Sequence, residues 1–231
     1  MNHIISAGIV LSMTLFFSCK KDKSVEPETL TTTSTTPLSY KNYSALKVGN
    51  YWIYQRFYTD DFGVETPMSI IDSCYIEKDT VILGNTYYKY MSPKINSPSP
   101  SPDIQNPHSP EYYRDSLSYL VSSNGRIEFS SEDFTTEFKN DYQIILPLDT
   151  ICHFIFKMDD KDVNYITPSG IYKTSNFKET YYMFSGYNTG GLIRNRSTRY
   201  SENIGKVSEG FYFFVSVPRH WERKLIRYHL N

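Results

Sequence analysis

The chain has 231 residues, a formal net charge of −1, and 16% aromatic residues, among them 21 tyrosines. Charges of both signs are mixed along the sequence, which gives no strong field for a polyanion, so nucleic-acid binding is not expected. Tyrosine and phenylalanine favour the pleated, half-buried surface of β-strands. The composition therefore favours a β-rich domain.

The N-terminus begins with an apolar segment, residues 4–17 (IISAGIVLSMTLFF). It is too short to span a bilayer, which takes about 20 residues, and it fits the apolar core of a signal peptide. The polar chain begins abruptly at Cys19, and Phe16 and Phe17 are too bulky for an ordinary secretory cleavage site. A different kind of processing is therefore expected at this position.

The segment Phe16-Phe17-Ser18-Cys19 resembles the lipobox of bacterial lipoprotein precursors. The resemblance implies that residues 1–18 are a signal peptide and that Cys19 carries the lipid anchor, with fatty acids such as palmitate. Two or three acyl chains hold a protein stably on a membrane, whereas one holds it only marginally. Lys20 follows the cysteine in place of an aspartate that retains some lipoproteins in the inner membrane. By that resemblance, the protein belongs to the cell envelope as an outer-membrane lipoprotein.

Residues 19–44 continue as a polar segment rich in Thr, Ser, Pro and Glu. Such a segment buries too little apolar surface to offset the entropy of ordering it. We therefore expect an acylated cysteine followed by a flexible tether up to residue 44, and a single β-rich domain over residues 45–231.

The expected domain shows short aromatic and β-branched runs separated by turn residues. Gly84-Asn85 and Asn124-Gly125 are typical of two-residue hairpin turns. Residues 93–110 contain six prolines, which fix φ and remove backbone donors, so they predict an inserted Pro-rich loop. The predicted strands lie at 51–58, 68–83, 86–91, 118–122, 126–130, 142–146, 150–158, 163–166, 180–187, 198–200, 206–217 and 225–230.

This pattern predicts a mainly β fold with little helix, in which an antiparallel sheet is curved, forms a sandwich or is barrel-like. The aromatic run Tyr51-Trp52-Ile53-Tyr54 is expected to be a central strand buried on both faces.

Three stretches of the domain resemble Bacteroidetes lipoproteins with uncharacterised β-rich bodies: Val48 to Tyr54, Asp79 to Gly84, and Tyr200 to Val207. The resemblance implies a compartment and a β fold, and it implies no activity. The sequence departs from the group at Lys206, where an apolar residue is usual.

Cys74 and Cys152 both lie in strand-like runs. An exported protein meets oxidising conditions, so these residues either form a disulfide or are two separate buried thiols. Thr80, Ser116 and Thr150 each lie in an Asp-(Ser/Thr)-apolar triplet. These triplets resemble the O-glycosylation sites of Bacteroidetes exported proteins, which makes the three hydroxyls candidate modification sites.

No motif assigns a metal, a cofactor or a catalytic residue. The five histidines are scattered without zinc-like spacing. Asp160, Asp162 and Asn164 alternate as in a calcium loop, but Tyr165 stands where such a loop needs its turning glycine. The sequence therefore predicts no metal site and favours a protein that is not an enzyme.

The function expected is a non-enzymatic binding or structural β domain, held at the membrane by a lipid anchor, for a glycan, lipid or protein ligand. One alternative is a lipid or lipoprotein carrier, which would enclose an apolar cavity. Another is a surface glycan-processing enzyme, which would have a cleft with two facing carboxylates. A flat, exposed aromatic row would instead favour glycan or protein binding.

Overall fold

The computed structural model describes residues 39–60, 62–93, 108–145, 149–187, 191–212 and 220–231. The chain divides into residues 1–38 and Ser39–Asn231, and only the second unit is described. The expected signal peptide, the lipid site at Cys19 and the tether up to residue 38 lie outside the described residues.

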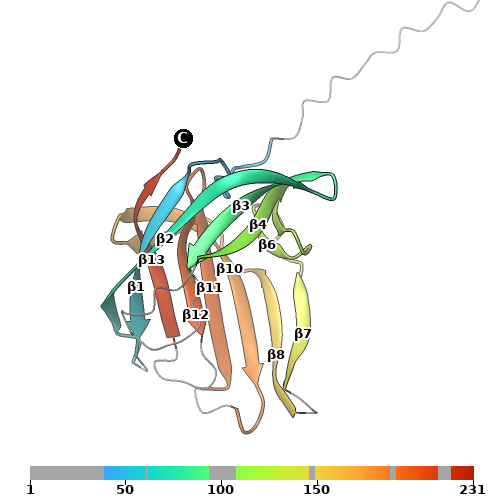
Figure 1. Ribbon diagram of the computed structural model, residues 1–231. Helices are drawn as coiled ribbons and strands as arrows, with labels where there is room; N and C mark the ends of the chain where they lie inside the picture. Colours follow the sequence, from blue (N-terminus) through green and yellow to red (C-terminus); the bar gives the residue numbers. More distant parts are fainter. Residues whose placement is uncertain (1–38, 61, 94–107, 146–148, 188–190, 213–219) are drawn as a thin grey trace, which may run out of the picture. The chain divides into compact units, whose positions relative to one another are not determined.

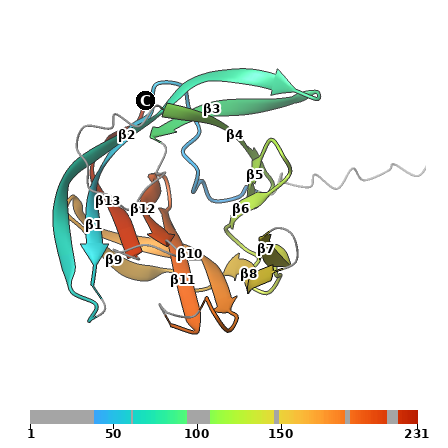
Figure 2. The same ribbon diagram turned by 60° about the horizontal axis from the view of Figure 1, so that its bottom comes forward.

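Thirteen strands form one antiparallel sheet, and none of the described residues is helical. The sheet curls around an interior but does not close (Figures 1 and 2). The mainly β fold with an antiparallel curved sheet is thus confirmed. The strands are β1 (Tyr51–Thr59), β2 (Glu65–Ile82), β3 (Asn85–Pro93), β4 (His108–Ser116), β5 (Tyr119–Ser122), β6 (Ile127–Ser130), β7 (Lys139–Ile145), β8 (Asp149–Met158), β9 (Val163–Thr167), β10 (Gly170–Met183), β11 (Ile193–Ser201), β12 (Gly205–Tyr212) and β13 (His220–His229).

The strand order is β6-β5-β4-β3-β2-β1-β13-β12-β11-β10-β8-β7, with β9 paired to β10 beside this path. The first six strands form one meander, and β7 to β13 form a second arm. The arms join at the centre of the sheet, where β1 pairs with β13. The free edges are β6 and β7, which follow each other in the chain but do not pair.

The two faces of β1 differ because one faces the interior and the other faces outward. Trp52, Tyr54 and Arg56 point inward and are buried, whereas Tyr51 and Ile53 are half-buried. The strand is central, as predicted from its aromatic run. The expected burial on both faces is wrong, since only alternate side chains reach the interior of a single curved sheet.

Side chains near the two free edges of the sheet pack against other strands. The rings of Phe129 on β6 and Tyr200 on β11 lie 4.6 Å apart, and the rings of Phe138 and Phe177 stack at 6.3 Å. Ser130 on β6 also directs its backbone N–H at the sulfur of Met158, 3.3 Å away. Phe129 and Ser130 on β6 thus contact β11 and β8 of the second arm, although no backbone ladder joins β6 to β7.

Several predicted boundaries need correction. The β2–β3 hairpin turns at Leu83-Gly84 and not at Gly84-Asn85, since Ile82 pairs with Asn85. The expected Pro-rich loop at 93–110 is too wide, because Pro93 ends β3 and residues 108–110 begin β4. Its central part, residues 94–107, lies outside the described residues.

The end of the expected tether also belongs to the domain. The predicted boundary at residue 45 is too late, because Tyr43 is 5% exposed and its ring lies 4.9 Å from that of Phe129. A single aromatic residue in a polar segment gives little sequence signal for burial, which explains the difference.

Candidate functional site

The interior of the sheet is charged at its centre. Arg56 donates two hydrogen bonds to Asp72, at 2.8 and 2.7 Å, and both side chains are buried. Arg223 from β13 lies 3.9 Å from Asp72 and donates to Glu209 at 3.0 Å. Since buried charges are costly unless paired, these contacts form a chain that ties β1, β2, β12 and β13 together.

Glu209 is the hub of this network, since three cations meet it. Besides Arg223, Arg196 and Lys206 each lie 3.1 Å from its carboxylate oxygens. Burial acts to raise the pKa of Glu209, but Arg223, Lys206 and Arg196 together hold that pKa well below its usual range. Lys206, where an apolar residue was expected, therefore faces inward as one partner of a buried carboxylate.

A second carboxylate, Glu128 on β6, lies in the same polar region. Burial raises the pKa of Glu128, although Arg126 donates to it at 2.5 Å and acts in the opposite direction. Environments that move two carboxyl pKa values apart are a feature of acid–base sites. The cavity that both residues line has a volume of only about 50 Å³, room for a few water molecules and not for a sugar ring.

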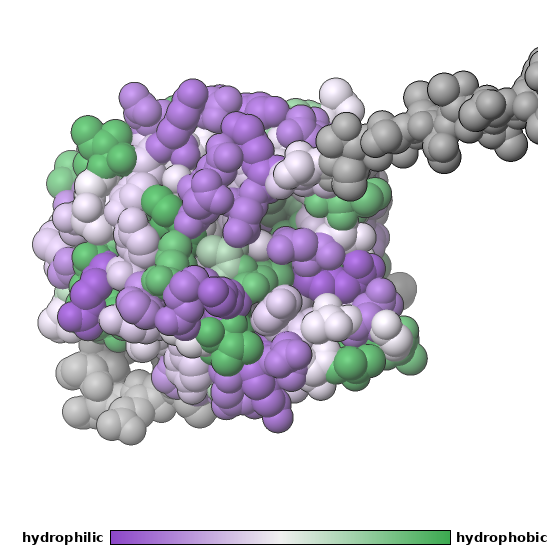
Figure 3. Space-filling model, turned by 90° about the horizontal axis from the view of Figure 1, so that it is seen from above, coloured by the Kyte–Doolittle hydropathy of each residue, from purple (hydrophilic) through white to green (hydrophobic). Residues whose placement is uncertain are grey.

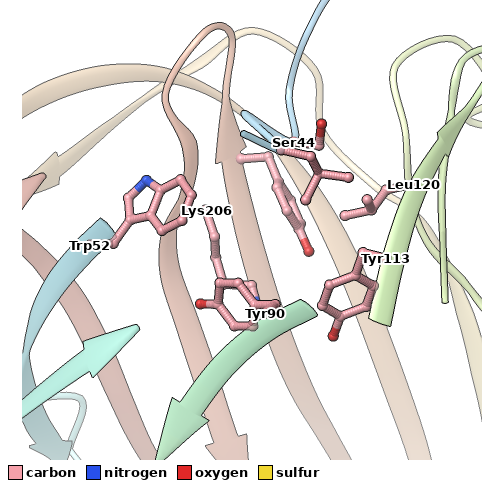
Figure 4. A pocket seen from close by; sticks show the side chains of 8 residues that line it. Ser44, Trp52, Tyr90, Tyr113, Leu120 and Lys206 are labelled. Carbon is pink, nitrogen blue, oxygen red and sulfur yellow. The ribbon is translucent and has the colours of Figure 1, made fainter. Parts of the chain in front are cut away.

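An aromatic pocket adjoins this polar cavity. Figure 4 shows Trp52, Tyr90, Tyr113 and Lys206 around it, with Leu120 at one side. Its volume is about 20 Å³, roughly one water molecule. These two cavities are therefore small, and neither has the size of the apolar cavity expected of a lipid carrier.

An exposed aromatic row crosses the outer face of the second arm. Tyr142 on β7 lies opposite His153 on β8, His153 lies opposite Tyr182 on β10, and Tyr182 lies opposite Ile193 on β11. Tyr142 is 55% exposed, Tyr182 41% and Ile193 56%. These four residues, here called the outer row, come from strands adjacent in the sheet.

The rings of the outer row are turned toward one another. The centroids of Tyr142 and His153 lie 4.9 Å apart, and those of His153 and Tyr182 lie 5.7 Å apart with planes at 21°. Phe184 extends the cluster, with its ring 6.3 Å from that of Tyr142. Exposed aliphatic side chains, Ile144 and Leu192, belong to the same strand ends.

The two cysteines considered as a possible disulfide, Cys74 and Cys152, lie far apart in the sheet. Both thiols are free and buried. Cys74 lies on β2, opposite Trp52 of β1, and Cys152 lies on β8, opposite Met183 of β10. The strands β2 and β8 are six positions apart in the strand order. Of the two alternatives that the sequence left open, two separate buried thiols describe the structure.

The candidate O-glycosylation residues lie in or at the ends of strands. Thr80 is on β2, Ser116 ends β4 and Thr150 is on β8, and all three are half-buried. The calcium-like segment around Asp160 and Asp162 joins β8 to β9. Within the described ranges, no group of three or more His, Cys, Asp or Glu side chains is arranged to hold a metal ion.

No known protein family matches the sequence, and no curated protein matches it. A candidate lipoprotein from Parabacteroides distasonis is 10% identical in structural alignment, with a TM-score of 0.45, over 83% of this chain and 100% of that one. A candidate exported protein with a YmcC-like fold from Bacteroides fragilis is also 10% identical, with a TM-score of 0.44, over 82% of this chain and 99% of that one. Similarity at this level carries no argument about what the protein does.

The part of the chain that the structure describes contains no helix with the length and apolarity needed to cross a membrane.

The outer row was not found from the sequence. Tyr142, His153 and Tyr182 were each placed in a predicted strand, but the sequence does not show that these strands are neighbours. The strand β8, which carries His153, pairs with β10 and not with the next strand in the chain, β9. Only the pairing register shows that the four side chains share one face.

Proposed function

We propose that the protein is an outer-membrane lipoprotein, anchored through Cys19, whose β domain binds a protein partner without catalysing a reaction. The binding surface is the outer row with its flanking residues Phe184, Ile144 and Leu192. The observation that carries the proposal is the alignment of exposed aromatic and aliphatic side chains across four adjacent strands. Contiguous exposed apolar groups on a soluble domain mark interaction sites.

The geometry of the rings favours a protein over a glycan. A sugar stacks on a free aromatic face, whereas the faces of Tyr142, His153 and Tyr182 are largely turned toward one another. The ring edges, together with Ile144 and Ile193, offer a mixed aromatic and aliphatic surface. Protein interfaces are enriched in such residues at their centres.

The position of the outer row at the edge of the sheet adds a second reason. β7 is the last strand in the order, so one of its edges has no strand neighbour in the described part of the chain. An extended segment of a partner can continue a sheet at such an edge, with main-chain hydrogen bonds giving affinity. Tyr142 and Ile144 on β7 would then contact the added strand.

A photo-crosslinking experiment tests the binding surface. The crosslinker p-benzoylphenylalanine replaces Tyr182, and in a second chain it replaces Ile171, which is exposed on the same strand but outside the outer row. In intact cells of the producing bacterium, we expect one discrete protease-sensitive adduct from position 182 and none from position 171. Equal adducts at both positions, no adduct at either, or a glycosidase-sensitive adduct would contradict a protein partner at this surface.

The anchor is tested separately. Cells fed labelled palmitate should transfer label to the wild-type chain and to Cys74→Ala, but not to Cys19→Ala, because the lipobox ends at Cys19. Label retained in Cys19→Ala would mean that the lipid, if present, is attached elsewhere.

A further inference from the structure

The segment before β1 crosses the open end of the curled sheet. Residues 39–46, here called the strap, run toward β5 (Figure 2, blue). On one side, Lys41 pairs with Glu202 at 2.9 Å in the β11–β12 turn, where Asn203 also donates its N–H to the Asn42 carbonyl. On the other, the Ser44 hydroxyl donates to Asp115 on β4 at 2.8 Å. The strap thus bridges turns of the two opposite arms.

The strap is held by hydrogen bonds and single side chains, and not by a backbone ladder. It forms no strand pairing, and Tyr43 is its one large, fully buried aromatic side chain. Ala45 has φ of 49°, a left-handed conformation that side chains other than glycine rarely adopt. A segment with few buried apolar contacts and a strained residue belongs to the parts of a protein that open most readily.

Imperfect packing surrounds the strap on both sides. The aromatic pocket of about 20 Å³ is lined by Ser44 and Leu46 of the strap (Figure 4). A second cavity, of about 120 Å³, lies along Tyr40 to Ser44. Both cavities also reach Leu120, so withdrawal of the strap would join them.

The joined space would be bounded largely by rings, with Asp115 and Lys206 as charged groups in its wall. Its walls include Trp52, Tyr90 and Tyr113 from the first pocket and Phe129 from the second. Figure 3 looks onto this end of the sheet and shows apolar side chains in a hollow ringed by hydrophilic ones. The ring of Tyr43 lies beside this space, with its centroid 4.9 Å from that of Phe129.

We propose that the strap is displaceable and covers a binding site for a small aromatic molecule, whose ring replaces that of Tyr43. A small aromatic ligand is expected because the site already accommodates the phenol ring of Tyr43. Apolar cavities of a protein bind ligands of matching shape, as an engineered cavity binds benzene. This site lies at the end of the interior and is independent of the outer row.

A reversible lock on the strap tests the proposal. In the full chain, Ser44→Cys combined with Asp115→Cys places two thiols where the hydroxyl and carboxylate now touch. The probe is p-cresol, the side-chain analogue of tyrosine, and binding is measured by calorimetry with and without a disulfide reductant. The wild-type chain, with Cys19, Cys74 and Cys152, is the control in both conditions.

We expect p-cresol to bind the wild-type chain equally in both conditions, and to bind the double variant at least tenfold more weakly when its disulfide is formed than after reduction. Equal binding by the locked and unlocked variant would overturn the proposal, as would no binding by wild type.

A second pair of variants keeps the test decisive if the locked chain does not fold. Tyr43→Ala vacates the ring site and should bind p-cresol at least tenfold more tightly than wild type. Tyr172→Ala removes a partly buried tyrosine elsewhere in the core and should leave the affinity unchanged. An equal gain in both variants would show that any truncated ring creates a site, and no gain in Tyr43→Ala would show that the strap does not cover one.

Discussion

Trp52 on β1 packs against the turn that joins β11 to β12. Its side chain is 2% exposed, and its indole N–H donates to the Ile204 carbonyl at 2.7 Å. Because truncation leaves both a cavity and an unpaired carbonyl, Trp52→Ala should lower the free energy of unfolding by about 3–5 kcal/mol. Urea unfolding measures this. Tyr51→Ala, at the next and half-buried position, should cost about 1 kcal/mol or less, and equal losses would contradict the inward orientation of Trp52.

Glu209 makes stability depend on pH in a defined direction. A carboxyl whose pKa is lower in the folded state stabilises the fold above its unfolded pKa of about 4.3, and this contribution is lost as the pH falls toward the folded value. Glu209→Gln leaves Arg223, Arg196 and Lys206 without their shared anion, so it should cost about 3–5 kcal/mol at pH 7.

Because glutamine does not titrate, the difference between wild type and Glu209→Gln should narrow as the pH is lowered from 5 toward 3. The free energy of unfolding of both chains, measured by denaturant at several pH values, checks this. A difference that stays constant over this range would mean that the three cations do not lower the pKa of Glu209.

The turn between β2 and β3 contains a residue, Leu83, that is unfavourable for its backbone conformation. Leu83 is 95% exposed and has φ of 49°, followed by Gly84 at 79°. Positive φ at both central residues is typical of a type I′ turn, for which Asn-Gly is preferred. Leu83→Asn should therefore stabilise the domain by about 0.5–1 kcal/mol, which raises the Tm by about 1–4 °C.

Leu83→Thr is the matched control for this turn, since it also removes the exposed leucine but disfavours positive φ. Thermal unfolding should show no gain for threonine. A similar rise in both variants would assign the effect to the loss of apolar surface and not to the backbone.

The β character and most hairpins could be predicted because aromatic and β-branched runs alternate with Gly and Asn turns. The polar strands were harder. β4 begins with His108-Ser109-Pro110, which is typical of a loop, and residues 170–179 of β10 were missed for a related reason. Its inward positions include Ser175 and Glu179, which are polar yet buried. Where charged side chains pair inside the sheet, hydrophobic alternation no longer marks the inner face.

The candidate sites depend on tertiary register and were less predictable. The outer row needs three strand pairings to be known together, and the strap needs the burial of Tyr43 against β6. Whether Cys74 and Cys152 could pair stayed open for the same reason, since strand-like sequence does not state which strands are neighbours.

For the whole molecule, β13 joins the two arms, because it lies between β1 and β12 in the sheet. A chain ending at residue 219 should lose cooperative unfolding, since Arg223 would also be missing from the charged network. Circular dichroism during urea titration checks this. A chain ending at residue 229 lacks only the two residues after β13, is the control, and should keep a single transition; a cooperative transition in the shorter chain would show that the arms fold without their joint.

The pairing of the first strand with the last also sets the order of events during synthesis. β1 leaves the ribosome about 170 residues before its partner β13 is complete, and contacts so distant in sequence are slow to form. Until then, both arms lack the strand that covers the charged groups between them. For an exported chain, which an outer-membrane lipoprotein as proposed above would be, a fold that only its final ten-residue strand completes delays folding until the whole chain has been made.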